Sequence, residues 1–133
     1  MVRAHTVTRM ATIVLMDELA TVAPRTRVRL VARLVSYSHM EAIVAEPDET
    51  LPALVLRVDT CMLAEARLGA LGSLVNLLGE LDADRHGLVL RASIAHVVDE
   101  LNVVLWRRAL LLRRGFLLDA AKGQAQRDTH QDA

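Results

Sequence analysis

The side chains that can support catalysis or hold a metal are few and scattered in this chain. Glu80, Asp82 and Asp84 form an acidic cluster near an expected turn, and paired carboxylates can act as general acid and base. No nucleophile–base pair or phosphate-binding loop accompanies them. The five histidines lack metal-ligand spacing, and Cys61 is the single cysteine. We therefore expect no catalytic site, metal or cofactor, and interpret the acidic cluster as a solvated turn.

A run of arginines at mostly alternate positions is the second pattern with chemical potential. Arg25, Arg27, Arg29 and Arg33 can hold phosphates or meet a partner's carboxylates, because guanidinium binds both in bidentate fashion. The alternative is an ordinary solvated strand face. Tyr37 can stack a base, although a partly buried position at a strand end is favoured. Arg27, Arg33 and Tyr37 are thus candidates for weak nucleic-acid contacts shared with a partner.

Aromatic and aliphatic residues near the C-terminus form the third pattern. On a helical wheel, Trp106 and Leu110 lie on one apolar stripe, and Leu101 and Leu105 lie on another roughly opposite. A helix that packs only on its own domain needs one apolar face, so the second is available to a partner. Large aromatics at interface centres contribute much of the binding energy. The alternative is that the Trp106 stripe packs against the N-terminal segment. Phe116 has no obvious place in the core.

Composition limits the classes of protein to which the chain can belong. At 133 residues with 53% hydrophobic and 2% aromatic content, we expect one domain with an aliphatic core. Sixteen basic residues balance sixteen acidic ones, so no global field attracts nucleic acid or an anionic membrane. No apolar run approaches the roughly 18 residues that a membrane span requires. We expect a soluble, intracellular protein with no membrane contact.

Alternating polarity and turn residues indicate the strands that must position these side chains. Five segments are typical of strands: 25–37, 40–45, 53–59, 72–81 and 88–98. Val28, Leu30, Ala32 and Leu34 point to one side of the first. The last two segments, joined by the polar link 82–87, predict a hairpin around which the rest is organised.

Two segments outside the predicted strands have the residue types of helices. Good helix formers predict a short helix over 61–68, and Asp99 can cap a final helix over about 100–114 that Gly115 ends. Residues 10–20 fit either a short strand or one or two helical turns. We expect 1–24 to be an N-terminal extension, 25–115 the domain with its interaction helix, and 116–133 a disordered tail.

This succession of elements, β-β-β-α-β-β-α, is the order of an OB-fold. It is an all-β, five-stranded, partly open barrel with a helix between the third and fourth strands, here followed by a C-terminal helix. Ala32 stands where many OB-folds have a glycine that bends the first strand.

Three segments then resemble a known family. The run RVRLVARLVSY at 27–37, the run GSLVNLLGEL at 72–81 and Leu101-Asn102-Val103 at the start of the last helix resemble the TEN-one family. Its members are the smallest OB-fold subunits of the telomere-capping CST complex (CTC-STN-TEN). The likeness covers about residues 26–116, and Arg29 matches a family arginine in the first strand.

The resemblance implies a function shared with partners. The last helix and the adjoining barrel face would pack on the OB domain of an STN-type subunit, and a larger CTC-type subunit would join through the complex. The complex would bind single-stranded telomeric DNA and act with DNA polymerase alpha-primase in C-strand replication, in the nucleus at chromosome telomeres. The candidate partner contacts are Arg29, Leu101, Leu105, Trp106, Leu110 and Phe116.

Two alternatives remain open at this point. The small OB-fold subunit of replication protein A has the same fold and also assembles through a final helix. A different class would be a small nucleic-acid-processing enzyme or a helical regulatory homodimer.

Overall fold

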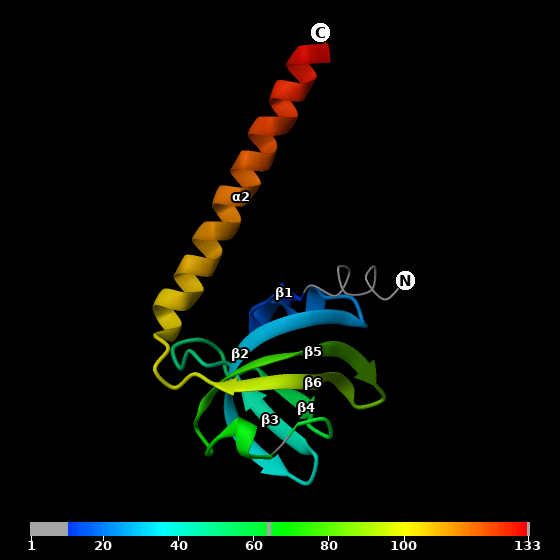
Figure 1. The fold of residues 1–133 in the computed structure, drawn as a ribbon, viewed down its shortest axis with the longest axis vertical. Helices are drawn as coiled ribbons and strands as arrows, with labels where there is room; N and C mark the ends of the chain where they lie inside the picture. The colour runs from blue at the N-terminus through cyan, green and yellow to red at the C-terminus, as the bar shows by residue number, and fades with distance from the viewer. Residues whose placement is uncertain (1–10, 64, 133) are drawn as a thin grey trace. The chain divides into compact units, whose positions relative to one another are not determined.

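The computed structural model describes residues 11–63 and 65–132 in two compact units, with the boundary after Leu101. The first unit is a barrel, and the second is a single helix (Figure 1). The elements in chain order are β1 (Thr12–Ile13), η1 (Met16–Thr21), β2 (Thr26–Ser38), β3 (Glu41–Ala45), β4 (Val55–Asp59), η2 (Glu65–Leu68), β5 (Leu74–Asp84), β6 (Gly87–Val97) and α2 (Val103–Asp132).

Five strands close into a barrel in the order β2-β3-β4-β6-β5, because β5 returns to pair with β2. The long strand β2 makes closure possible, since residues 26–33 pair with β5 and residues 33–38 pair with β3. β4 and β6 join in parallel over only three residue pairs, from Arg57↔Val89 to Asp59↔Arg91. The predicted five-stranded OB-fold barrel with a C-terminal helix is confirmed.

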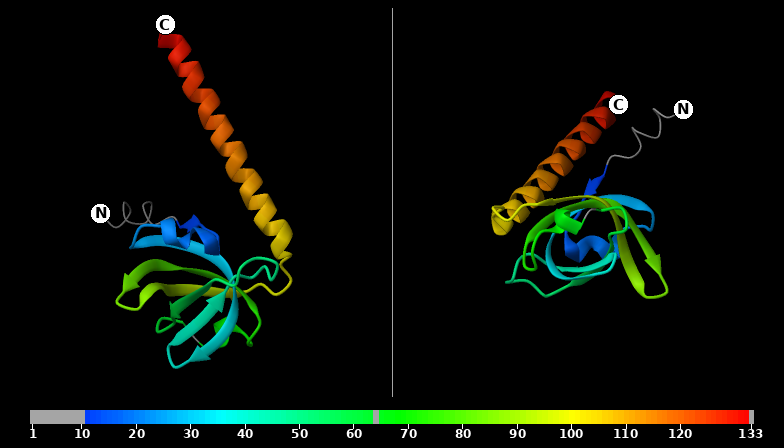
Figure 2. Two further views of the ribbon diagram at one scale, coloured as in Figure 1. Left: turned by 180° about the vertical axis from the view of Figure 1, so that it is seen from behind. Right: turned by 60° about the horizontal axis from the view of Figure 1, so that its bottom comes forward.

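Alternation along β2 places its aliphatic side chains in the core of the barrel. Val28, Leu30 and Ala32 are fully buried and Leu34 nearly so, as the period-two pattern predicts. Facing strands add the aliphatic side chains of Val44, Val58, Val75, Leu77, Leu81 and Leu90. Figure 2 shows these strands wrapping around the common interior from two further sides.

The curvature of the barrel does not require a glycine at position 32. β2 has a bulge between Leu34 and Ser36, and bulges bend a strand and increase its twist. A second irregularity, between Leu78 and Gly79, brings β5 close to β6. A Cβ atom at Gly79 would lie 2.2 Å from the carbonyl oxygen of Arg91. Gly79 is therefore the position where a glycine is needed.

The described part of the expected N-terminal extension, residues 11–24, packs on the barrel. β1 pairs in parallel with the start of β2, and η1 follows it, so the segment holds both a strand and a helical turn. Met16 and Leu19 of η1 are buried in the core cluster. Leu15 N–H donates to the Glu18 carboxylate at 2.7 Å and fixes the entry to the turn. Residues 1–10 lie outside the described part.

Two predicted elements are shorter in the structure. The helix expected over 61–68 is one 3₁₀ turn, η2, whose Leu68 is 1% exposed and packs in the core. Before η2 begins at Glu65, the backbone N–H of Leu63 donates to the carbonyl of Thr60 at 2.9 Å in a separate turn. The link expected over 82–87 is a two-residue turn at Arg85 and His86, because β5 continues to Asp84.

The final helix is longer than predicted and begins later. α2 starts at Val103 and continues through Gly115 to Asp132, so its expected end at Arg114 is wrong, and 116–132, expected as a disordered tail, is helical backbone. A glycine ends a helix when it adopts a left-handed conformation, and Gly115 is not among the residues with positive φ. No helix among the described residues is long and apolar enough to cross a membrane.

Candidate partner-binding surface

α2 is started by Asn102, which corrects the expected cap at Asp99. The Asn102 side-chain oxygen accepts the backbone N–H of Leu105 at 3.1 Å, the contact of an N-cap residue with the third residue of its helix. The Asp99 carboxylate instead accepts the backbone N–H of Leu74 at 2.7 Å. Leu101, predicted on the helix face, precedes the helix, and its N–H donates to the carbonyl of Val98.

The first half of α2 has two apolar stripes, as its spacing predicts. The stripe of Leu105 is largely exposed, and its other members are Val104, Leu111 and Leu112. The second stripe, half-buried, consists of Val103, Trp106 and Leu110. Leu105 is 57% exposed, and Phe116 is 74% exposed and lies within the helix rather than beyond it. Exposed apolar patches of this kind mark protein-interaction surfaces.

Charge on this half of α2 has a single sign. Between Asn102 and Leu118 the sequence contains four basic residues and no acidic one: Arg107, Arg108, Arg113 and Arg114. The surface of the helix therefore combines apolar stripes with positive charge. A complementary partner would present apolar side chains surrounded by carboxylates.

Arg29 lies exposed on the outer face of the barrel in a row of side chains, here called the Arg29 row, that crosses the four strands β1, β2, β5 and β6. Its neighbour on β5 is Leu78, and the neighbour of Leu78 on β6 is Ile94, which is exposed. On the other side Arg29 pairs with Ile13 of β1, and its carbonyl accepts the N–H of Val14 at 2.9 Å. Arg29 therefore has aliphatic neighbours on both sides in the row, and it suits a partner surface in which a carboxylate lies among apolar side chains.

The three candidates for nucleic-acid contact are not gathered into one site. Arg33 donates to the carbonyls of Gly72 at 2.9 Å and Pro47 at 3.1 Å, so its guanidinium joins two loops of the domain. Tyr37 packs against the core cluster, in agreement with the alternative of a partly buried residue. Arg27 is half-buried on β2. Their predicted role in nucleic-acid binding stays a prediction.

Two of the three acidic residues first considered for catalysis serve in ion pairs that close the barrel. The Asp84 carboxylate accepts Arg57 Nη2 at 2.5 Å, and this hydrogen bond holds the pKa of Asp84 below its ordinary value. Arg91 lies 3.2 Å from Asp59 and 3.5 Å from Asp82. These pairs link β4, β5 and β6 where the parallel pairing is short, so Asp82 and Asp84 lie on a strand and not in a solvated turn.

The same network lowers the reactivity of the single cysteine. The backbone N–H of Cys61 donates to Asp59 at 3.0 Å, and this bond is the main cause that lowers the pKa of Asp59. The Asp59 carboxylate in turn raises the pKa of the exposed Cys61 thiol. A raised pKa leaves less of the thiolate, which is the nucleophilic form, at neutral pH. In the described part of the chain, no group of three or more potential metal ligands comes together.

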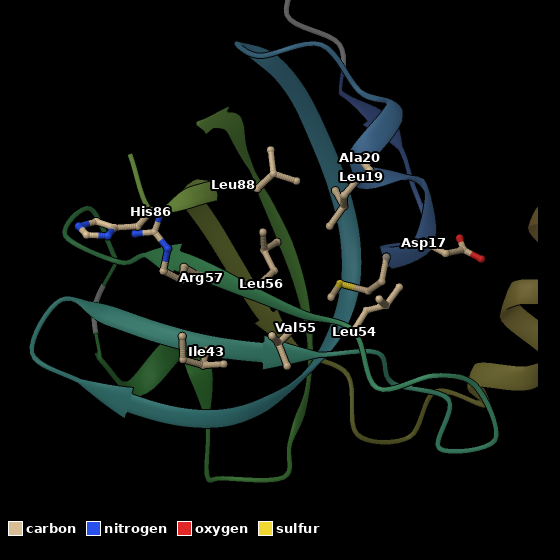
Figure 3. A pocket seen from close by; sticks show the side chains of 11 residues that line it. Asp17, Leu19, Ala20, Ile43, Leu54, Val55, Leu56, Arg57, His86 and Leu88 are labelled. Carbon is tan, nitrogen blue, oxygen red and sulfur yellow. The ribbon is translucent and has the colours of Figure 1, made fainter. Parts of the chain in front are cut away.

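A groove of about 460 Å³ lies along β4, opposite η1 (Figure 3). Its walls are mainly aliphatic: Met16, Leu19, Ala20, Ile43, Leu54, Val55, Leu56 and Leu88. Its polar groups are Asp17 at one end and Arg57 with His86 at the other. No Phe, Tyr or Trp side chain lines the groove. Sequence reasoning did not identify it, because its residues come from four separate segments.

The comparison with protein families decides the identity of the chain. One family model matches residues 7–120, which include the barrel and the first half of α2. The family is described as a telomere-capping subunit of the CST complex. The chain belongs to this family. The resemblance found in residues 26–116 is therefore confirmed.

Solved structures show that this CST-family chain has the fold of its counterparts. A chain of the S. pombe Stn1–Ten1 complex is 11% identical, with a TM-score of 0.68, over 80% of this chain and 93% of that one. The telomere-capping protein Ten1 from S. pombe is 12% identical, with the same TM-score, over 80% of this chain and 99% of its own. At such identities the likeness shows the fold alone. A search of curated proteins found no match.

Membership in the CST family also decides between earlier alternatives. The match assigns the chain to a telomere-capping complex and not to replication protein A. The helical homodimer is wrong, because residues 11–101 form a closed barrel.

Proposed function

We propose that this chain is the smallest, non-catalytic OB-fold subunit of a CST complex and that it binds an Stn1-type partner through α2 and the Arg29 row. The observation that carries the proposal is the exposed apolar stripe of Leu105 and Leu112 on the first half of α2, which lies inside the region matched by the CST family model. One of the similar structures is a complex of Stn1 with Ten1, which supports a partner of that type.

Within α2 we assign the partner contact to both stripes. Leu105 and Phe116 supply exposed apolar surface, and Trp106 with Leu110 supplies the anchors on the other stripe. Leu101, the last residue of the barrel unit, is assigned to the contact as well. The arginines of α2 and Arg29 then meet carboxylates at the rim of the contact, where they favour rapid and specific association more than affinity.

We assign binding of single-stranded telomeric DNA to the assembled complex rather than to this chain alone. OB-folds that grip single strands use aromatic platforms in a basic groove. Here the groove along β4 is aliphatic, and Tyr37 packs against the core. The chain would then support end protection and C-strand replication with DNA polymerase alpha-primase by stabilising its Stn1-type partner and, through that partner, a larger CTC-type subunit. Its location would be nuclear, at chromosome telomeres.

Co-expression with the Stn1-type subunit of the same genome tests this proposal. We expect a stable one-to-one complex by size-exclusion chromatography with light scattering. Leu105→Asp introduces a charge into the exposed stripe and should abolish the complex. Val35→Asp is the matched control, because Val35 is a similarly exposed aliphatic residue, at 48%, on the barrel. Equal complex formation by both variants would refute the assignment of α2.

A further inference from the structure

The groove along β4 lies on a part of the barrel that other OB-folds use for ligands. In this fold the face of the second and third strands, bordered by the loop between the fourth and fifth, binds oligonucleotides. The corresponding elements here are β3, β4 and the β5–β6 turn, which contribute Ile43, Val55 and His86 to the groove. Neither Arg29 nor any residue of α2 lines the groove.

The edge of β4 is unpaired where it borders the groove. Pairing between β4 and β6 begins only at Arg57, so residues 54–56 have no strand neighbour on that side in the described structure. Glu46 N–H donates to the carbonyl of Leu54, which places the hydrogen-bonding groups of Leu54 towards β3. Because these groups alternate sides along an antiparallel strand, the N–H and C=O of Val55 point towards the groove.

The side chains around this edge favour peptide over nucleic acid. Val55 is 66% exposed, and Leu19, Ile43 and Leu88 provide aliphatic walls without a stacking platform. An extended peptide can add a strand to such an edge, where main-chain hydrogen bonds supply affinity and pockets for alternate side chains supply specificity. The groove offers a single strand of DNA no Phe, Tyr or Trp ring on which to stack and only one arginine among its lining residues.

Charge at the ends of the groove defines the ligand further. Among the described residues, Arg57 donates through Nη2 alone, to Asp84 and to the carbonyl of Gly87. Its Nη1 and Nε atoms are available to an added carboxylate, since guanidinium has five N–H donors. Asp17 lies at the opposite end (Figure 3). An acidic residue of the ligand is therefore attracted to the Arg57 end of the groove.

We propose that this groove binds an extended peptide segment of another protein, with alternating aliphatic side chains and an acidic residue that contacts Arg57. The segment adds a strand beside Leu54–Leu56 and bonds to the free N–H and C=O of Val55. Its aliphatic side chains fill the space between η1 and β4. The surface thus gives this subunit a second docking site that does not depend on α2.

Fluorescence anisotropy with a defined probe tests the site on the full-length chain. The probe is a labelled peptide Lys-Leu-Val-Leu-Val-Glu; Lys-Ser-Thr-Ser-Thr-Glu and Lys-Leu-Val-Leu-Val-Gln are its controls. We expect the first to bind at least about tenfold more tightly than either control, a difference of about 1.4 kcal/mol. At saturation the Val55 amide should exchange with solvent at least about tenfold more slowly.

Two aspartate variants locate the bound peptide. Val55→Asp should weaken binding of the probe at least about tenfold. Val97→Asp changes the same residue type at a position 42% exposed on β6, outside the groove, and should bind as the wild type does. Leu54→Asp, also in the groove, provides a second variant if Val55→Asp does not fold. Any of three results would overturn the proposal. The three peptides could bind equally, Val97→Asp could weaken binding as much as Val55→Asp does, or oligothymidylate could displace the probe. None of these results depends on an Stn1-type partner.

Discussion

Replacing Gly79 with alanine should lower the free energy of unfolding of the barrel, because the added methyl group has no room between β5 and β6. A Cβ atom at this position would lie 2.2 Å from the Arg91 carbonyl oxygen and 2.8 Å from the Ala92 Cα atom. Carbon atoms in favourable contact are about 3.5–4.0 Å apart. The obstructing atoms belong to the backbone of β6, so no side chain can rotate to relieve the clash.

The expected cost follows from this geometry. Overpacking a core costs about 1–3 kcal/mol, and we expect Gly79→Ala at the upper end because β6 must move away from β5. Domains are stable by only about 5–15 kcal/mol. A loss of about 3 kcal/mol would lower the midpoint of thermal unfolding by about 12–24 °C for a barrel of this size.

Differential scanning calorimetry measures this effect on the barrel transition. Trp106 is a poor reporter because it lies on α2, outside the barrel unit. Gly115→Ala is the matched control, since no atom lies within 4 Å of a Cβ at that position, and it should leave the barrel transition unchanged. If Gly79→Ala changed the unfolding free energy by less than about 0.5 kcal/mol, the close approach of β5 and β6 would be wrong.

Three further results are expected. The Arg57 hydrogen bond lowers the pKa of Asp84, and a lowered folded-state pKa adds stability that is present above the ordinary value of 3.8 and is lost as the pH falls below it. In calorimetric scans, the wild-type barrel should therefore lose more stability between neutral and strongly acidic pH than the Arg57→Gln variant does. The same pH dependence in both proteins would show that the Arg57–Asp84 pair does not contribute to it. Asn102→Ala should destabilise α2 by about 0.5–2 kcal/mol and lower the helical circular dichroism, whereas Asn102→Asp should preserve it; equal signals would reject the cap. The isolated chain should bind telomeric single strands weakly at physiological salt, and tight binding by anisotropy would contradict the shared DNA site.

The barrel could be predicted from the sequence because its signals are local and repeat along each strand. Alternation from Val28 to Leu34 has one structural solution, a strand with one face buried. The hairpin of β5 and β6 was recognisable for the same reason, although its two-residue turn was not. A long polar link and a tight turn contain the same residue types. Here the turn is tight because β5 continues to Asp84, where the Asp82 and Asp84 carboxylates form ion pairs with Arg91 on β6 and Arg57 on β4.

The errors concern positions that tertiary contacts decide. Asp99 is a good cap by residue type, but the N–H of Leu74 takes its carboxylate, and Asn102 caps the helix three residues later. Gly115 resembles a helix terminator, yet its neighbours on both sides are helix formers and its backbone remains helical. The groove was missed because the edge of β4 becomes free only through the register between β4 and β6.

Truncation of the chain after Leu101, at the boundary of the two compact units, tests the central claim most directly. The measurement is calorimetric titration of the Stn1-type subunit into the full-length chain and into the truncated barrel, with the barrel's folding verified by its thermal transition. We predict binding to the full-length chain and at least about tenfold weaker binding to the barrel, a loss of about 1.4 kcal/mol or more. Equal affinity for both would contradict the assignment of α2 as the partner-binding element.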